Sequence, residues 1–486
     1  MKKRLAVVLA VMMALSTVLT GCGGGKKADP AADAQTQAAA QSQASAAPES
    51  TEGEEAAAVS NLNTEDEFVL KIWLTPQWVG VFDQTAEGAA YTDYFEYVGE
   101  KFNELHPNVK VEVTQITGSE RNAVLTSNIQ SGTQPDIFFD TSMVMTDFAH
   151  MGALVPLDDL VGEADRSDIF QDAWDGCSVA DQLYFYPFFM VTGSLIVNND
   201  ALKASGHEDM IPAEYEMGTW KPEEFKAVLA DMRDKVTDQG FYPLGFYCKN
   251  EQSDQYNNSY LQMYGAKMFS EDSSEVTINT EKGIQAMDFI KSLYDEGLME
   301  PSPESMGSAD TREMFRNQQL GVAYCLTTHY NEIKSAMETG ELEKFDYSLF
   351  MLPGEEKPIS FAQYYGACAF DTGEEERIQW AKELIKFFSS DPELVMASAT
   401  AGVPVRQSVI EQVAEKQPEL PMFMAQSDYF VNYNGGIPNY SEFRKALYPQ
   451  FQAVLAGTMT SREALDDFKA KADEIIKNGK EESELY

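Results

Sequence analysis

Short runs of β-forming residues alternate with amphipathic helical segments between residues 68 and 139, and this alternation constrains the fold most. Residues 68–74 have the strand-like sequence Phe-Val-Leu-Lys-Ile-Trp-Leu. Apolar side chains at helical spacing predict helices over 92–105 and 119–131. A second strand is predicted where Val109, Val111 and Val113 alternate with polar residues, and a short buried third strand over 137–139. This order of elements is typical of an α/β layer with a parallel sheet.

The pattern continues with interruptions to the end of the chain, whose 486 residues suffice for more than one domain. Further helices are predicted over 219–233, 280–296 and 374–389, and the capping box Thr460-Ser461-Arg462-Glu463 begins a last one. Isolated strands are predicted over 194–198, 321–325 and 367–370. The sequence has no repeat of fixed period.

The amino terminus has the features of an export signal. Lys2, Lys3 and Arg4 precede an apolar stretch over 5–19 that is too short to span a bilayer comfortably. This stretch ends in Leu19-Thr20-Gly21-Cys22, which resembles a bacterial lipobox. The resemblance implies that residues 1–21 are a lipoprotein signal peptide and that the Cys22 thiol carries a lipid anchor. An ordinary signal peptide ending near a cysteine is the alternative.

The segment that follows has a different composition. Residues 22–64 begin with three glycines after Cys22 and are then rich in Ala, Gln, Ser and Glu, without large apolar clusters. Such a composition cannot bury a core and predicts a flexible tether. About forty residues of this kind give a root-mean-square reach of roughly 35 Å.

Charge and cysteine content exclude several functions. The 36 Lys and Arg residues against 78 Asp and Glu residues give a net charge of −42, which repels nucleic acid. None of the five cysteines lies in a C-x-x-C pair or at zinc-ligand spacing, so we predict no metal site and no cofactor. Besides Cys22, the cysteines either form two disulfides or are buried free thiols, and their wide spacing favours free thiols: Cys177, Cys248, Cys325 and Cys368.

Seven short motifs occur in order along the chain and together resemble extracellular solute-binding protein family 1, which supplies maltose-type and multiple-sugar ABC importers. Individually they are weak. They are Phe102-Asn-Glu-Leu-His-Pro-Asn-Val-Lys-Val-Glu-Val113, Ser131-Gly-Thr-Gln-Pro-Asp-Ile137, Gly152-Ala-Leu-Val-Pro-Leu-Asp-Asp159, Tyr186-Pro187 with Leu195-Ile-Val-Asn-Asn199, Thr219-Trp220, Gly402-Val-Pro-Val-Arg406 and Leu455-Ala-Gly457. The sequence departs from the family pattern in a longer segment over 206–218 and in Tyr330, which replaces a usual Trp.

The resemblance implies a two-lobed periplasmic-binding-protein-like fold of type II. Each lobe would be a β-sheet flanked by helices, with the ligand cleft between the lobes. The first lobe would hold residues 65–185 and 328–366, and the second 186–327 and 367–486. The family's function implies a lipid-anchored protein on the extracytoplasmic face of a bacterial membrane. It would act as a monomer that captures a carbohydrate for the permease of an ABC importer.

A carbohydrate site needs hydrogen-bonding groups for hydroxyls and aromatic rings for the apolar C–H faces of the sugar. In open α/β sheets such a site lies at the carboxyl ends of the strands. The candidates follow predicted strands or lie where the resemblance implies that the chain crosses between lobes: Trp78, Glu120, Asp140, Thr141, Phe188, Tyr330, Gln363 and Tyr365. We expect a structural role for Arg406, bracing the second lobe. The tyrosine-rich loop over 429–440 either lines the cleft or packs on that lobe.

Three other functions remain as alternatives. The first is the same role for a non-sugar organic solute such as a polyamine or a peptide, which the acidic charge mildly favours when the solute is a cation. The second is a secreted carbohydrate-active enzyme, but no nucleophile, metal or nucleotide motif is present, and carboxylate pairs arise by chance among 78 acids. The third is a structural lipoprotein without a cleft.

Overall fold

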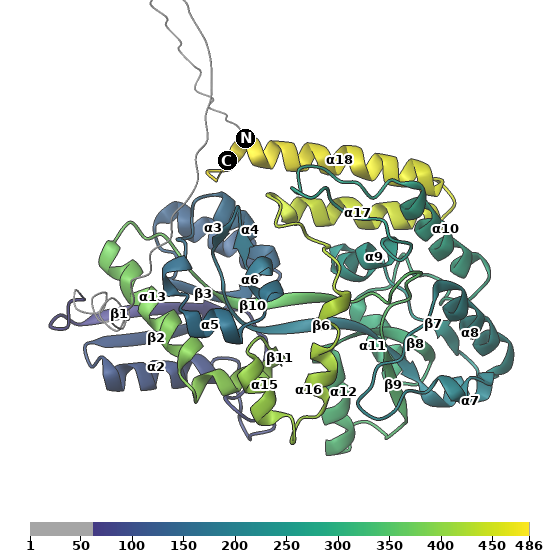
Figure 1. The fold of residues 1–486 in the computed structure, drawn as a ribbon, viewed down its shortest axis with the longest axis horizontal. Helices are drawn as coiled ribbons and strands as arrows, with labels where there is room; N and C mark the ends of the chain where they lie inside the picture. The colour runs from purple at the N-terminus through teal and green to yellow at the C-terminus, as the bar shows by residue number, and fades with distance from the viewer. Residues whose placement is uncertain (1–61, 486) are drawn as a thin grey trace, which may run out of the picture. The chain divides into compact units, whose positions relative to one another are not determined.

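A computed structural model describes residues 62–485. The predicted signal peptide, Cys22 and all but the last residues of the predicted tether lie outside this range. The described chain is built around a nine-stranded sheet with the path β2-β1-β3-β10-β6-β8-β7, in which β9 and β11 also pair with β6 (Figure 1). The main strands are β1 (Phe68–Leu74), β2 (Val109–Gln115), β3 (Ile137–Thr141), β6 (Tyr186–Asn198), β7 (Tyr242–Leu244), β8 (Leu320–Leu326), β9 (Tyr347–Phe350), β10 (Phe361–Ala369) and β11 (Val403–Pro404).

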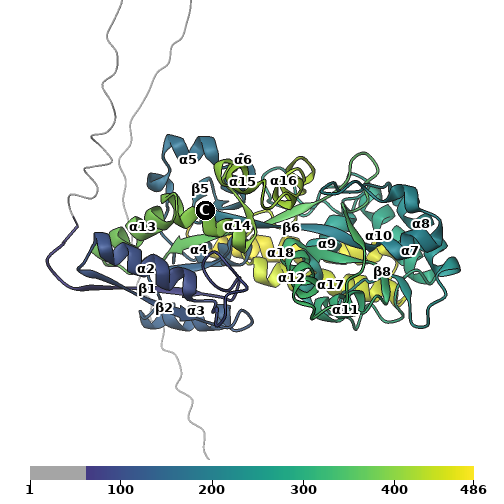
Figure 2. The same ribbon diagram turned by 90° about the horizontal axis from the view of Figure 1, so that it is seen from below.

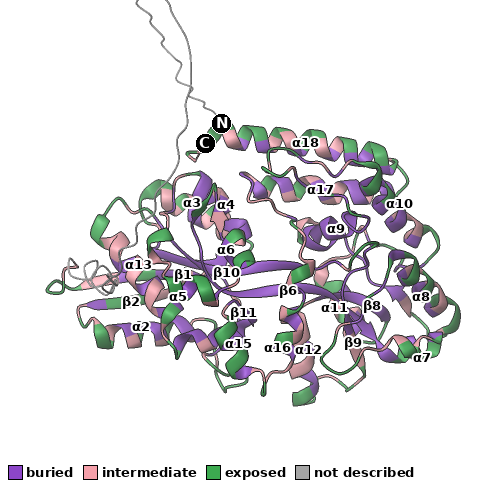
Figure 3. Cartoon of the chain, viewed as in Figure 1, coloured by how far each residue is buried: buried purple, intermediate pink, exposed green. Residues whose placement is uncertain are grey.

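Strand directions divide the sheet into two halves. In the first half, β1 lies between β2 and β3 and pairs with both in parallel. In the second half, β7 and β8 are parallel, and both β8 and β9 pair with the carboxyl-terminal part of β6. Two antiparallel strands, β6 and β10, cross from one half to the other. All thirteen residues of β6 are buried, as the continuous purple ribbon in Figure 3 shows.

Helices flank both halves of the sheet (Figures 1 and 2). In the first half, α2 and α13 pack on β2 and β1, and α4 packs on β3 and β10. In the second half, α8 and α11 pack on β7 and β8, and α17 packs against α18 and α10. The bounds are α2 (Asp93–Leu105), α3 (Arg121–Ser131), α4 (Ser142–His150), α5 (Glu163–Asp168), α6 (Gln171–Gly176), α7 (Asn199–Ser205), α8 (Pro222–Lys235), α9 (Asp254–Leu261), α10 (Glu281–Asp295), α11 (Ser308–Arg316), α12 (Thr327–Thr339), α13 (Glu375–Ser390), α14 (Ser398–Ala401), α15 (Gln407–Val413), α16 (Glu419–Met424), α17 (Tyr440–Leu455) and α18 (Ser461–Glu482).

Two segments are placed differently from the expected division into lobes. We expected residues 328–366 in the first lobe, but α12 packs on β8 and β9 pairs with β6 in the second half. We expected everything after residue 366 in the second lobe, but α13 packs on α2 and β1 in the first half. The reason is the sheet topology, because the chain returns to the first half along β10.

Arg406 has the structural role that we expected, but in the first half. Its guanidinium donates to Asp165 Oδ1 at 2.6 Å, to Asp168 Oδ2 at 3.2 Å and to the Ser389 carbonyl at 2.6 Å. It therefore ties the start of α15 to α5 and to the end of α13. Among the described helices, none is long and apolar enough to cross a bilayer.

Candidate functional site

The carboxyl ends of strands from the two halves meet at the crossing strands. Thr141, the last residue of β3, pairs with Tyr365 of β10. Leu326, the last residue of β8, pairs with Gly193 of β6, which itself pairs with Phe361 of β10. Tyr365 and Phe361 are four residues apart, so the two strand ends lie about 13 Å apart along β10. Ligands of open α/β sheets bind at such strand ends.

The first half contributes a chain of buried and half-buried polar groups to this region. Gln77 Nε2 donates to Thr75 Oγ1 at 2.7 Å, and that hydroxyl donates to Asp140 Oδ2 at 2.8 Å. Arg121 Nη1 donates to the same oxygen at 2.8 Å, and the Thr141 N–H donates to Asp140 Oδ1 at 2.6 Å. Asp140 is 1% exposed. Hydrogen bonds therefore connect the end of β1, the end of β3 and the start of α3.

The second half contributes a buried ion pair of its own. Arg444 of α17 donates through Nε to Asp254 Oδ2 at 2.6 Å and through Nη2 to Oδ1 at 3.1 Å. The Tyr440 hydroxyl donates to the same Oδ2 at 2.9 Å. Asp254 is the first residue of α9, where a carboxylate also suits the positive end of the helix dipole.

Charged groups from both ion pairs act on the hydroxyl of Tyr365. Burial raises the pKa of its hydroxyl well above the usual range, and the Asp140 carboxylate adds to the rise while Arg121 and Arg444 oppose it. Its ring stacks on Phe189, with centroids 4.7 Å apart and planes 3° from parallel. Its hydroxyl donates to Gln363 Oε1 at 3.4 Å. The ring is therefore fixed against Phe189 of β6.

A cavity of about 290 Å³ opens in this region. The first half contributes Gln77 and Gln84 to its lining, and α12 of the second half contributes Thr328, Asn331 and Glu332. The Gln84 amide also donates to the Thr400 carbonyl, which ties the loop after β1 to α14. Amides, a hydroxyl and a carboxylate offer donors and acceptors together, as a polyhydroxylated solute requires.

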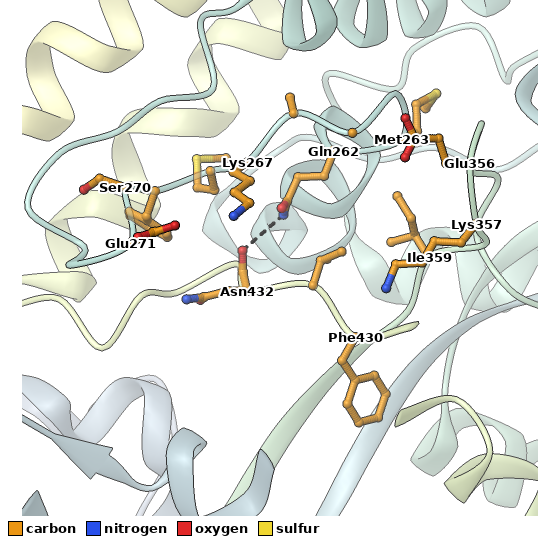
Figure 4. Close-up of a pocket in the computed structure, with 15 residues that line it drawn as sticks. Gln262, Met263, Lys267, Ser270, Glu271, Glu356, Lys357, Ile359, Phe430 and Asn432 are labelled. Atoms are coloured by element: carbon orange, nitrogen blue, oxygen red, sulfur yellow. Dashed lines mark hydrogen bonds between the residues drawn. The ribbon is translucent and has the colours of Figure 1, made fainter. Parts of the chain in front are cut away.

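Two further cavities follow the segment over 430–436 that leads into α17. One of about 360 Å³ contacts α4, α6 and Tyr364 of β10, and the other, of about 400 Å³, contacts residues 262–271. They share Phe430, Val431 and Asn432. Figure 4 shows the second cavity, in which Gln262 Nε2 donates to the Asn432 carbonyl at 3.2 Å. None of the three cavities is lined by either ion pair. We place the candidate site at the cavity of about 290 Å³, because Gln77 shortly after β1 and Thr328 shortly after β8 line it together.

The structure brings part of the predicted residue set together. Asp140 and Thr141 lie at the cleft, and Tyr365 lies beside them on β10. Gln363 is bonded to Tyr365 and also lines the cavity of about 360 Å³ beside α4 and α6. Glu120 immediately precedes α3 and is exposed.

Three predicted residues lie elsewhere. Trp78 and Phe188 are 6% and 3% exposed, and their rings stack 6.4 Å apart in an aromatic cluster with Tyr94 and Phe139. Their packing gives them a role in the core of the first half, because sequence position after a strand does not tell which way a ring points. Tyr330 lines a separate cavity on the second half, beside Tyr347.

Asp254, Arg444 and Gln77 were absent from the predicted set. The pair of Asp254 and Arg444 is separated by 190 residues, and neither belongs to a local motif. Gln77 carried a usable signal, because it follows the first predicted strand as directly as Trp78 does. Tyr440 belongs to the loop for which we left two roles open, and its hydroxyl joins the ion pair of the second half.

The cysteines outside the signal region are free and buried, as the sequence favoured. They are Cys177, Cys248, Cys325 and Cys368. Within residues 62–485 no group of three or more His, Cys, Asp or Glu side chains is arranged to hold a metal ion.

Two α/β halves joined by crossing strands, with buried polar groups where their strand ends meet, define a solute-binding protein. The chain matches the model of the bacterial extracellular solute-binding proteins over residues 84–394 and belongs to this family. The family is non-catalytic.

Individual relatives are distant. A binding protein of Brucella abortus is 22% identical over 412 residues, which cover 81% of this chain and 92% of the relative. A Thermotoga lettingae ABC-transporter solute-binding protein bound with α-D-tagatose superposes with a TM-score of 0.67 at 20% identity, covering 84% of this chain and 100% of that one. The cyclic α-maltosyl-1,6-maltose binding protein of Arthrobacter globiformis gives 0.68 at 18%, covering 85% and 100%. At these identities the structures establish the fold.

Proposed function

We propose that the protein captures a carbohydrate, a mono- or oligosaccharide, in the cleft between the two halves and delivers it to the permease of an ABC importer. The observation that carries this proposal is the cavity at the strand ends that Gln77 of the first half lines together with Thr328 and Asn331 of α12. Sugar hydroxyls both donate and accept, and such a mixed lining offers both functions. The two solved relatives described above bind sugars, which supports the same ligand class here.

Burial of the polar groups supports a closing mechanism. In the proposed cycle the open halves admit the solute, closure excludes water, and the closed form docks on the permease. Removing competing water strengthens each hydrogen bond to a sugar hydroxyl. The solute shifts the equilibrium only by as much as it binds the closed form more tightly than the open one.

The sequence supports attachment to the membrane through a lipid on Cys22. The tether over 22–64 would then let the folded part reach roughly 35 Å from its anchor. In this arrangement the protein is held, as a monomer, on the extracytoplasmic face of the cell membrane, where its permease lies.

A non-sugar organic solute is the second candidate, and the net charge of −42 favours an organic cation among these. The two carboxylates that line the cavity weigh against a cation, because Glu332 is paired with Arg312 and Glu341 with Arg316. We therefore place carbohydrate first.

A thermal-shift screen of the protein against mono- and oligosaccharides, with spermidine and short peptides as competitors, tests this choice. A sugar that raises Tm is then titrated calorimetrically against Gln77→Ala and against Gln412→Ala, an exposed glutamine on α15 that serves as the matched control. We expect Gln77→Ala to weaken binding about tenfold, the effect of one or two lost hydrogen bonds, and the control to leave it unchanged. Stabilisation by spermidine or a peptide and by no sugar would overturn the proposal.

A further inference from the structure

A separate cavity of about 400 Å³ lies on the second half, and its lining shares no residue with that of the cavity beside Gln77. Its walls come from α12, β9 and the segment over 211–216. This segment belongs to the stretch over 206–218 whose length departs from the family pattern. The longer segment therefore forms one rim of the cavity.

Three tyrosines line this cavity. Tyr330 of α12 and Tyr347 of β9 are half-buried, with ring centroids 6.0 Å apart and planes at 77°. Phe423 of α16 supports the Tyr330 ring from a centroid distance of 5.3 Å. Tyr215 on the rim is 46% exposed. Rings that are fixed and partly open to solvent offer apolar faces to the C–H groups of a sugar.

Tyr215 is held in an unfavourable backbone conformation. Its φ is +60°, in the left-handed region that a bulky side chain rarely adopts. The conformation places a large, exposed aromatic side chain on the rim of the cavity, where an exposed ring contributes little to the core. Strain of this kind is found most often where a side chain has a binding role.

Two polar atoms near the cavity are buried without a hydrogen-bond partner among the described residues. Asn199 lines the cavity and is 8% exposed, and its Oδ1 is buried with no hydrogen-bond partner among the described residues. Lys334 also lines the cavity and donates to Glu419 Oε1 at 2.6 Å. Glu419 is 5% exposed, and its Oε2 likewise has no partner in the described part of the chain. Such atoms are costly unless water or a bound molecule satisfies them.

The charge of the lining narrows the ligand class. Glu214 and Glu216 on the rim and Glu419 behind it stand against the single ammonium of Lys334, which disfavours an anion. Lys334 is paired with Glu419, so Glu214 and Glu216 leave the rim net negative, and an organic cation is the competing ligand that the experiment must distinguish. Three tyrosine rings beside the polar side chain of Asn199 suit a neutral molecule with hydroxyl groups and apolar faces.

We propose that this cavity is a second carbohydrate-binding site, outside the cleft, that takes a neutral oligosaccharide across Tyr215, Tyr330 and Tyr347. A site of this kind does not depend on closure of the two halves. It would hold glycan near the protein while the cleft binds the transported solute, and it stands whether or not the cleft itself takes a sugar.

Saturation-transfer difference NMR on the full chain tests the proposal, with maltotriose, cellotriose and xylotriose as neutral probes and spermidine as the cationic probe. We expect the signal of at least one trisaccharide to fall at least threefold in Tyr215→Ala. The signal should persist in Gln77→Ala, which alters the cleft, and in Tyr91→Ala, an exposed tyrosine of the first half. Tyr215→Phe keeps the aromatic face and should retain at least half of the signal.

Because Tyr215 is exposed, its two substitutions should keep the wild-type Tm, which is measured in parallel for every variant. The proposal is overturned if no trisaccharide signal depends on Tyr215, or if every dependent signal also disappears in Gln77→Ala. It is equally overturned if spermidine alone shows dependence on Tyr215, because the cavity would then bind an organic cation.

Discussion

Arg121 and Asp140 form an ion pair of 2.8 Å at the carboxyl end of β3, and the Asp140 side chain is 1% exposed. The Thr75 hydroxyl and the Thr141 N–H donate to the same carboxylate. The pair thus joins three elements of the first half at the place where the second half approaches. Loss of this ion pair should therefore both destabilise the fold and shift the ends of β1 and β3 at the cleft.

Arg121→Met should lower the free energy of unfolding by about 3 kcal/mol, the lower end of the cost of leaving one member of a buried pair uncompensated. The lower end applies because the Arg121 side chain is 14% exposed. Urea denaturation measures the change. Arg166→Met, at an exposed arginine of α5, is the control and should change stability by less than about 0.5 kcal/mol. Equal effects of the two substitutions would show that the ion pair has no net stabilising role.

Glu300 is a buried acid, 2% exposed, whose Oε2 accepts the Phe246 N–H at 3.0 Å. Burial raises the pKa of its carboxyl to about 8, against a partial lowering by this N–H. The folded state therefore holds a proton that the unfolded state releases near pH 4.5, and stability is lost as the pH rises through this window to about 8.

Glu300→Gln should remove this loss, since the amide oxygen still accepts from Phe246. Relative to wild type, the variant should gain stability progressively between pH 5 and 8, by at most about 4 kcal/mol. Urea titrations at several pH values measure the difference. Glu376→Gln, at an exposed position of α13, should show a difference that does not depend on pH. A flat profile for Glu300→Gln would mean that its carboxyl ionises normally.

Local patterns predicted the elements of this fold well. The strand over 68–74 has the predicted bounds, and the helix predicted over 374–389 is found at Glu375–Ser390. Both have alternating or periodic burial, which sequence reveals directly. Only the last residues of β6, 194–198, were predicted, because a strand buried at all thirteen positions has no periodicity to detect. The division into lobes was misjudged for this reason, since β6 and β10 decide which segments lie together.

The site was partly predictable on similar grounds. Asp140 was identified because a carboxylate directly after a buried strand lies at the edge where ligands bind. Asp254 and Arg444 meet only through the packing of α9 and α17, and no local pattern connects them. Trp78 packs against Phe188 and Phe139, residues of other strands, and no local pattern reveals this direction of its ring.

Asp165 is a second test of pH dependence, with the opposite sign. Burial acts to raise the pKa of its carboxyl, but donation from Lys386 and Arg406 outweighs burial and holds the pKa below its usual 3.8. This stabilisation is present above pH 3.8 and is lost as the pH falls through the lowered pKa. Asp165→Asn should therefore cost about 2 kcal/mol at pH 7 and progressively less below pH 4, as measured by urea denaturation. A cost that is independent of pH would contradict the ion pairs with Lys386 and Arg406.

The buried cysteines predict slow thiol chemistry. Burial raises the pKa of all four thiols above the usual range, so little thiolate forms and reagents cannot reach it. In protein with Cys22→Ala, Ellman's reagent should detect almost no thiol in the native state. In guanidinium without reductant it should detect four, because all four are free. A count of two or zero after unfolding would indicate disulfides.

Closure of the cleft is testable at a contact between the halves that does not involve the candidate binding residues. Asn122 Nδ2 of α3 donates to Ser441 Oγ of α17 at 2.9 Å, and the Tyr440 and Ser441 N–H groups donate to Asp147 of α4. These bonds form only when the two halves are together, so they favour the closed state without contacting a solute held in the cavity beside Gln77.

Ser441→Ala removes the side-chain bond and should destabilise the closed state by about 1 kcal/mol. If the closed state is the one that retains the solute, apparent affinity should fall about fivefold, mainly through faster dissociation. Stopped-flow displacement of the bound solute measures this rate, and Ser131→Ala, at an exposed serine at the end of α3, is the control. An unchanged dissociation rate in Ser441→Ala would mean that the solute is released without separation of α3 from α17.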